Sequence, residues 1–124
     1  MAKPPIPSEA QLELLDILWQ NQPATVQQLH TAFTARRAVS YNTVLTQLQR
    51  MAKSGLVTRD TSSRTHLYTA AFDRKEIETT VFGRLASSVF GGSTFNLALR
   101  ALGNQTPSAA ELDELQAWID AQKK

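Results

Sequence analysis

The sequence has 124 residues, 42% of them hydrophobic, with 13 basic and 11 acidic side chains, a formal net charge of +2 and no cysteine. This size favours one compact domain, or one domain with a small appendage. The lack of cysteine excludes disulfides, thiolate metal sites and thiol redox chemistry. The apolar residues are dispersed at helical spacing, so no transmembrane helix is expected. The first residues lack the apolar core of a secretory signal, and we expect a cytoplasmic protein.

The charged residues are unevenly distributed along the chain. Residues 36–75 carry eight basic and two acidic side chains, a net charge of +6, whereas residues 1–35 and 76–124 each have a net charge of −2. A basic block of this kind is either a solvated face or the surface that meets a polyanion such as nucleic acid. The elements that carry the block decide between these two interpretations.

Three helices are predicted in the first half of the chain, over residues 8–20, 25–35 and 40–54. Each begins at a serine or threonine that can cap it, and the first two have a glutamine three residues later, as in a capping box. Gly55 is expected to end the third helix, because glycine tolerates the left-handed conformation at a helix C-terminus.

Two strand-like runs follow the third helix. Residues 56–60 (LVTRD) and 65–70 (THLYTA) are separated by the polar stretch TSSR, which favours a β-hairpin. Three helices followed by a two-stranded hairpin is the plan of a winged helix-turn-helix domain. The chain is therefore expected to be mainly α-helical with a small β-hairpin wing.

From Asp73 onward three helices are predicted. The FGGS stretch at 90–93 separates the first from the second, and a further loop separates the second from the third. Three short helices contain too few residues to build a sizeable core alone, so a partner must cover them, and an identical chain is the economical candidate. We therefore divide the chain into a winged-helix domain at 1–72 and a helical dimerisation region at 73–124. The residues predicted to form the dimer interface are Ile77, Val81, Leu85, Leu97, Leu112, Leu115 and Ile119.

The helix at 40–54 is the expected recognition helix of such a domain. Its outward residues include amides, hydroxyls and cations, which can read the base edges of a major groove, and Leu45 is expected on the same outward face. Phosphates need less precise partners, so the helix start and the wing can bind them. Taken singly, each polar residue is more simply a solvated side chain, but their coincidence with the +6 segment favours DNA binding. The predicted DNA-binding residues are Ser40, Tyr41, Asn42, Thr43, Thr46, Gln47, Gln49, Arg50, Lys53, Arg59 and Arg64.

Residues 8–68 (SEAQLELLDILW, TVQQL, VSYNTVLTQLQRMAKSGLVTR and LY) resemble the penicillinase-repressor (BlaI/MecI/CopY) family of bacterial winged-helix transcriptional regulators. The similarity continues through VFGGSTFNLAL and PSAAELDELQAWI, so it covers nearly the whole chain. It implies a sequence-specific repressor that binds a two-fold symmetric operator in double-stranded DNA as a homodimer, with interlocked C-terminal helices.

Three departures from the family pattern limit what the resemblance implies. Val39 stands where members often have tryptophan, and Arg100-Ala101 stands where penicillinase-type members have the Asn-Phe bond that is cut on induction. Copper-responsive members use a cysteine cluster that this chain lacks. Neither cleavage at residues 100–101 nor thiol–metal sensing is therefore expected, and a sensor or inducer stays unidentified.

No constellation of residues indicates an enzyme, a cofactor or a metal site. His30 and His66 have no neighbouring ligand residues at metal-binding spacing, and the serine pairs at 62–63 and 87–88 lack a basic partner. The alternative to a DNA-binding repressor is a winged-helix module that binds protein. Such a module would share the core and the dimer helices but would not need a basic recognition helix and wing.

Overall fold

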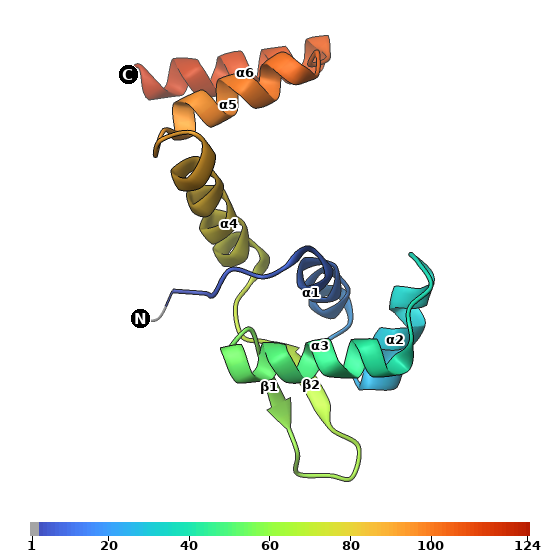
Figure 1. Ribbon diagram of the computed structural model, residues 1–124. Helices are drawn as coiled ribbons and strands as arrows, with labels where there is room; N and C mark the ends of the chain where they lie inside the picture. Colours follow the sequence, from blue (N-terminus) through green and yellow to red (C-terminus); the bar gives the residue numbers. More distant parts are fainter. Residues whose placement is uncertain (1–2) are drawn as a thin grey trace. The chain divides into compact units, whose positions relative to one another are not determined.

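The computed structural model describes residues 3–124, and within them the chain forms six helices and one antiparallel hairpin (Figure 1). Residues up to Arg84 form one compact unit, and residues 85–124 form a second. The elements are α1 (Glu9–Asn21), α2 (Val26–Thr34), α3 (Tyr41–Ser54), β1 (Val57–Asp60), β2 (Leu67–Ala70), α4 (Arg74–Val89), α5 (Thr94–Asn104) and α6 (Ala109–Gln122). The expected fold class, mainly helical with a two-stranded wing after the third helix, is confirmed.

The helix boundaries follow the capping residues that the sequence offers. Ser8 and Thr25 each accept a hydrogen bond from the backbone amide three residues later, and the glutamine at that position bonds back to the cap. Ser40 caps α3, and Gly55 ends it with φ of +92°, a conformation that a side chain would strain. These helix ends therefore satisfy their backbone groups locally, which fixes where the recognition helix starts and stops.

The core of the first unit lies among α1, α2, α3 and the hairpin. Leu15, Leu18, Leu29 and Leu48 are completely buried in it, and each such side chain contributes roughly 1.5–3 kcal/mol through the hydrophobic effect. The three helices thus bury one apolar stripe each, and the opposite stripe of α3 is left for solvent.

The hairpin is joined to the helices at its base. β1 pairs with β2 in the register Val57 to Ala70 and Asp60 to Leu67. The short segment between α1 and α2 adds a bridge, in which the amide of Ala24 donates to the carbonyl of Tyr68 at 3.0 Å and the amide of Tyr68 donates back at 2.8 Å. The base of the wing is therefore anchored to the helix-turn-helix, while residues 61–66 form its tip.

The start of α4 belongs to the first unit, and this corrects one predicted dimer contact. Ile77 is 1% exposed and lies in the same core as α1 and α3, so it is not available on an outer surface. Val81 is half-buried and packs against that core. The apolar residues Ile77, Val81, Leu85 and Val89 recur every four residues along α4, and the first two of them cover the chain's own core.

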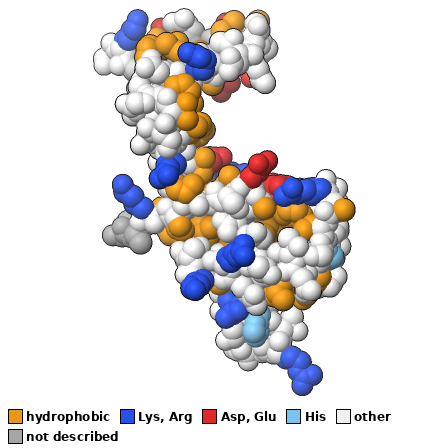
Figure 2. All heavy atoms as spheres, in the orientation of Figure 1, with side chains coloured by type: hydrophobic (Ala, Val, Ile, Leu, Met, Phe, Trp, Pro, Cys, Tyr) orange, Lys and Arg blue, Asp and Glu red, His pale blue; other side chains and the backbone are white. Residues whose placement is uncertain are grey.

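The second unit exposes most of its apolar side chains. Of residues 85–124, Ala86 alone is buried, whereas Phe95, Leu99 and Trp118 are more than half exposed. Figure 2 shows hydrophobic side chains at the surface of α4, α5 and α6. Exposed apolar area on this scale is typical of an interaction surface. Across residues 3–124, no helix has the length and apolarity needed to cross a membrane.

Candidate nucleic-acid interface

Helix α3, the predicted recognition helix, presents a buried apolar face and an exposed polar face. Val44, Leu48 and Met51 are buried, and the polar residues between them point away from the core. Leu45 is expected on the outward face, but it is half-buried and packs against the core. Gln47 is also half-buried, and its side-chain oxygen accepts a hydrogen bond from Gln11 Nε2 at 3.2 Å. The exposed polar residues of α3 include Asn42, Thr43, Thr46, Gln49, Arg50 and Lys53.

The start of α3 is held in place by short local contacts. Ser40 Oγ accepts a hydrogen bond from the amide of Thr43 at 3.1 Å and lies 2.8 Å from Thr43 Oγ1. His30 of α2 reaches the turn before α3, where its Nε2 donates to the carbonyl of Val39 at 2.8 Å, and its ring meets Tyr41 edge-on with 5.8 Å between centroids. His30 is therefore a structural residue that positions the helix start, and the described residues contain no cluster of acidic residues or histidines able to hold a metal.

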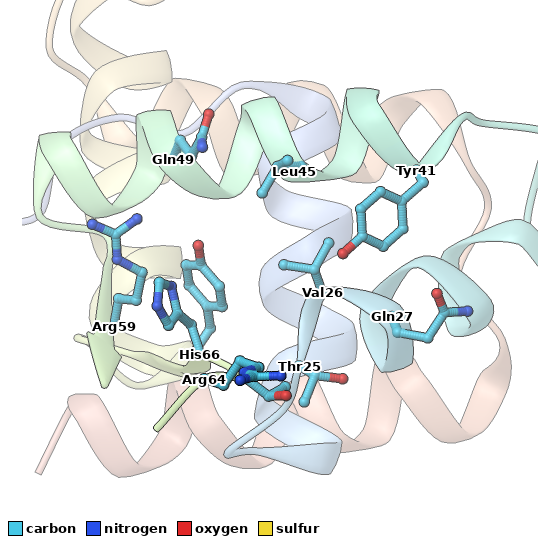
Figure 3. A pocket seen from close by; sticks show the side chains of 11 residues that line it. Thr25, Val26, Gln27, Tyr41, Leu45, Gln49, Arg59, Arg64 and His66 are labelled. Atoms are coloured by element: carbon cyan, nitrogen blue, oxygen red, sulfur yellow. The ribbon is translucent and has the colours of Figure 1, made fainter. Parts of the chain in front are cut away.

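A cavity of about 410 Å³ joins the recognition helix to the wing (Figure 3). Tyr41, Leu45 and Gln49 line it from α3, and Arg59 and Arg64 line it from the hairpin. A second hollow of about 270 Å³ lies along α3 and is lined by Asn42, Thr43, Thr46, Gln47 and Arg50. Nine of the eleven predicted DNA-binding residues thus line one of two hollows on α3, while Ser40 and Lys53 do not.

Sequence reasoning missed several polar residues of the larger hollow. Thr25 and Gln27 line it at the start of α2, and His66 lines it near the tip of the wing (Figure 3). Thr65 lines it beside His66. The predicted strand at 65–70 includes the two wing residues, but β2 begins only at Leu67, so both belong to the hairpin loop and could have been found by including every polar residue near its tip. The α2 residues had no such signal, because their approach to the wing depends on the bridge at Ala24.

The basic side chains of residues 36–75 form two groups, three that have an ion pair and five that have none within residues 3–124. Arg36 and Arg74 both form ion pairs with Asp16, and Arg37 pairs with Glu13 at 2.8 Å. These three arginines are held by carboxylates of α1. The other five cations of the segment have no carboxylate within ion-pair distance among residues 3–124, and they are Arg50, Lys53, Arg59, Arg64 and Lys75.

This division corrects the simple interpretation of the +6 block as one DNA-facing surface. Figure 2 shows acidic side chains beside α1, where they neutralise neighbouring basic groups. The uncompensated cations include two on the exposed stripe of α3 and two on the hairpin. The fifth, Lys75, lies in the first turn of α4, so four of the five uncompensated cations are on α3 and the hairpin.

The Asp16 carboxylate lies between two guanidinium groups. Hydrogen bonds from the guanidinium groups of Arg36 and then Arg74 lower the pKa of Asp16 below its ordinary value, because they stabilise the charged form. In the wing, hydrogen bonds from Ser62 lower the pKa of Asp60, and its carboxylate accepts from the Ser62 amide at 2.9 Å. The hydrogen bond from the Ser62 amide to Asp60 shapes the turn between Arg59 and Arg64.

The sequence is similar to that of known proteins. The family model described as "Penicillinase repressor" matches residues 7–121. The chain is 43% identical over 65 residues to the transcriptional regulator BlaI of Mycobacterium tuberculosis, a match that covers 52% of this chain and 47% of the relative. It thus spans about half the length of that relative. It is 23% identical over 123 residues to the penicillinase repressor of Bacillus licheniformis, covering 99% of this chain and 96% of the relative.

Two solved structures share the fold of the first unit. One is the solution structure of the DNA-binding domain of the repressor BlaI, with a TM-score of 0.54 and 25% identity. The other is the monomeric form of Bacillus licheniformis BlaI in complex with the blaP half-operator, with a TM-score of 0.53 and 25% identity. Each match covers 61% of this chain and 93% of the solved chain. The likeness is thus to a DNA-binding winged helix that has been solved on half of an operator.

The ion pairs of Asp16 predict a pH-dependent contribution to stability. Asp16→Asn should lower the free energy of unfolding by about 1 kcal/mol at pH 7, because two partly exposed ion pairs are lost. Since the folded-state pKa lies below the ordinary value of 3.8, this contribution is present above pH 3.8 and is lost as the pH falls through the folded-state pKa. Urea unfolding of both proteins at pH 7 and near pH 2 measures it.

The control for this prediction is Asp113→Asn, which removes an exposed carboxylate of α6 that has no ion pair within residues 3–124. This variant should match the wild type at pH 7. An Asp16→Asn deficit of the same size at both pH values would show that the substitution acts through packing and not through the ion pairs.

Proposed function

The chain belongs to the penicillinase repressor family, and we propose that it is a transcriptional repressor that binds double-stranded operator DNA through α3 and the hairpin. The relatives named above are repressors and a transcriptional regulator, and not enzymes. The structure of Bacillus licheniformis BlaI on the blaP half-operator supports DNA as the partner of this fold.

One observation carries the proposal: of the five cations in residues 36–75 that form no ion pair within residues 3–124, four lie on α3 and the hairpin. Arg50 and Lys53 lie on the exposed stripe of α3, and Arg59 and Arg64 lie on the hairpin beside the larger hollow. A protein that neutralises several phosphates gains affinity from the release of condensed counterions. The charge distribution thus favours a polyanion over a neutral protein surface.

The residues of this face divide by their chemistry into two roles. Asn42, Thr46 and Gln49 carry amides and a hydroxyl that can hydrogen-bond to base edges in a major groove. The cations, together with Ser40 and the free amides at the start of α3, suit phosphate oxygens. Tyr41, Thr43 and Gln47 stay in the proposed interface, with Gln47 placed at its margin because its oxygen already bonds to Gln11.

The competing function is a winged-helix module that binds protein and not DNA. A mobility-shift titration distinguishes the two, with duplexes selected by the protein from a random pool compared with unselected duplexes at two salt concentrations. A repressor should prefer the selected duplexes, and its affinity for both kinds should fall as salt rises. Binding that is weak, unselective and independent of salt would instead favour the protein-binding module.

We further propose that the chain acts as a homodimer through its C-terminal helices, within a dimerisation region at 73–124 and beside a DNA-binding domain at 1–72. The exposed apolar side chains of α4, α5 and α6 support this, since burying each large one is worth roughly 1.5–3 kcal/mol. The proposed interface keeps Val81, Leu85, Leu97, Leu112, Leu115 and Ile119, and it omits Ile77 because that side chain is used within one chain. Such a dimer would bind a two-fold symmetric operator.

The cellular location proposed for the repressor follows from its DNA partner. We place it in the cytoplasm, where an operator is accessible. Arg100 and Ala101 lie inside α5, so the bond between them is part of a regular helix. Relief of repression is proposed to use some route other than cutting at that bond.

Arg64 should contribute affinity without selectivity. Arg64→Gln is expected to reduce the slope of log affinity against log salt by about 1 and to weaken selected and random duplexes alike, since a phosphate contact is the same in every sequence. The matched control is Arg37→Gln, which removes an arginine that is ion-paired with Glu13 of α1. Equal slopes for the wild type and Arg64→Gln would remove Arg64 from the interface.

Thr46 should behave in the opposite way. Thr46→Ala is expected to cost roughly 1–3 kcal/mol on the selected duplex and far less on random DNA, because a hydroxyl that touches a base edge is lost while the charge is unchanged. Fluorescence anisotropy with both duplexes measures the difference. A parallel loss on both duplexes would assign Thr46 to the phosphates or to the fold.

Leu112 tests the dimer. This side chain is 49% exposed within one chain, so Leu112→Asp should leave the monomer folded. The variant should be more monomeric than the wild type, because it places a charge in an apolar interface. Light scattering at micromolar concentration measures the mass. Ala117→Asp places the same charge on the opposite face of α6 and should leave the mass unchanged. A wild type that is itself a stable monomer would contradict the proposal.

A further inference from the structure

Two glutamines connect the capping box of α1 to the recognition helix. The amide of Ser8 donates to Gln11 Oε1 at 3.0 Å, and the amide of Gln11 donates to Ser8 Oγ at 3.2 Å. The same Gln11 side chain reaches α3, where its Nε2 donates to Gln47 Oε1 at 3.2 Å. Both glutamines are half-buried. The cap of α1 is therefore bonded, through one side chain, to a residue of the proposed DNA interface.

The chemistry of these hydrogen bonds determines how each side-chain amide is turned. A backbone N–H can only donate, so the atom of Gln11 that meets the Ser8 amide must be its oxygen. The other end of the Gln11 amide is then its NH2 group, which also can only donate. The atom of Gln47 that meets this NH2 group must therefore be the oxygen. A backbone group of α1 thus sets the orientation of Gln47.

In this orientation Gln47 offers hydrogen-bond donors to a ligand of α3. Gln47 lines the smaller hollow on α3 together with Thr46 and Arg50, whereas Gln11 does not line it. The oxygen and the nitrogen of an amide diverge from one carbon, so the nitrogen of Gln47 is turned away from its contact with Gln11. The bond to Gln11 uses the oxygen and leaves the two Nε2 hydrogens for a partner outside the chain.

We propose that Gln11 is a positioning residue that makes Gln47 present donors only, so that Gln47 selects guanine at one position of the operator. The inference rests on the proposed function, because it needs α3 in the major groove of DNA. It goes beyond that function by giving Gln47 a base preference and by tracing this preference to a residue of α1. Gln11 itself contacts no base in this proposal.

The major-groove edges of the bases explain the preference for guanine. Guanine presents two neighbouring acceptors, N7 and O6, which match the two hydrogens of one NH2 group. Cytosine presents an NH2 donor, and adenine places its N6 donor beside N7. An unrestrained glutamine binds adenine well, because it donates to N7 and accepts from N6 through its own oxygen. Gln11 occupies the oxygen of Gln47, so Gln47 loses this adenine contact.

Gln11→Glu is the sharpest test, because it reverses the orientation of Gln47 without removing the helix cap. Glutamate at this position still accepts from the Ser8 amide, since both Glu and Gln complete a capping box. A carboxylate has no hydrogen to donate, so the Gln47 amide must turn and donate its NH2 group to the carboxylate. The variant then presents the Gln47 oxygen, which accepts from N4 of cytosine or N6 of adenine.

Selection of duplexes from a random pool by the full chain measures the base preference at each position. The position that Gln47 contacts is the one whose preference is lost in Gln47→Ala. There the wild type should prefer guanine over adenine and cytosine by roughly fivefold or more, as for a base-edge contact. In Gln11→Glu this preference should be replaced by one for cytosine or adenine on the same strand. The ratio between bases cancels any uniform effect of the added charge on affinity.

The matched control is Gln28→Glu. Gln28 has the equivalent place in the capping box of α2, where its Oε1 accepts from the amide of Thr25 at 2.9 Å. It does not line the hollow that contains Gln47. Gln28→Glu makes the same change of charge at the same position of a helix, and it should keep the guanine preference of the wild type.

The orientation can also be measured without DNA. In ¹H–¹⁵N spectra at pH 7, a side-chain amide hydrogen of Gln47 should move downfield in Gln11→Glu, because it gains a hydrogen bond to a carboxylate. The Gln47 side-chain resonances should stay in place in Gln28→Glu. Unchanged Gln47 resonances in Gln11→Glu would show that Gln11 does not orient this side chain, and they would overturn the inference.

The outcomes of the selection separate this inference from the function on which it rests. Guanine in the wild type, its loss in Gln11→Glu and its retention in Gln28→Glu support the inference. Adenine in the wild type, or guanine retained in Gln11→Glu, overturns it. If Gln47→Ala changes no base preference, Gln47 contacts phosphate or nothing, and the inference fails while the repressor proposal stands. If the wild type selects no duplex, both fail.

Discussion

The pairing of Glu13 and Asp16 with three arginines is the interaction on which this account of the molecule depends. It pairs three of the eight basic side chains of residues 36–75 with carboxylates of α1. Four of the remaining five lie on α3 and the hairpin, which are the elements proposed to meet DNA. Both carboxylates also attach the turn before α3 to α1, and Asp16 attaches the start of α4 to α1. The same contacts therefore affect the position of these segments and the distribution of charge.

The wing acquires its place through backbone hydrogen bonds and the core. The bridge between Ala24 and Tyr68 connects the hairpin to the segment before α2, and Tyr68 itself is buried. Because the base of the hairpin is fixed in this way, Arg59 and Arg64 lie beside Gln49 and Tyr41 around one hollow (Figure 3). A wing held only by its connecting chain would not form a continuous surface with the recognition helix.

Much of this architecture could be predicted from the sequence because its signals are local. The caps at Ser8, Thr25 and Ser40, the stop at Gly55 and the alternating runs of the hairpin each depend on a few neighbouring residues. The ion pairs of α1 could not be predicted in the same way. Arg36 and Arg74 are 20 and 58 residues from Asp16, and charge counting along the chain treats them as part of the DNA-facing block.

The burial of Ile77 marks a second limit of sequence reasoning. A four-residue apolar period shows that one stripe of α4 must be covered, but it does not show whether the cover is the same chain or another. In this molecule the stripe changes its role along its length. Ile77 is covered by the chain's own core, whereas Leu85 and Val89 remain exposed.

The central claim is that α3 and the wing, and not the ion-paired side at α1, meet DNA. Amide chemical-shift mapping of the ¹⁵N-labelled protein during titration with a selected half-site duplex tests it most directly. The account predicts the largest shifts in residues 40–50 and 59–66, with residues 9–16 of α1 little changed. Shifts concentrated on α1, or confined to residues 85–124, would contradict it.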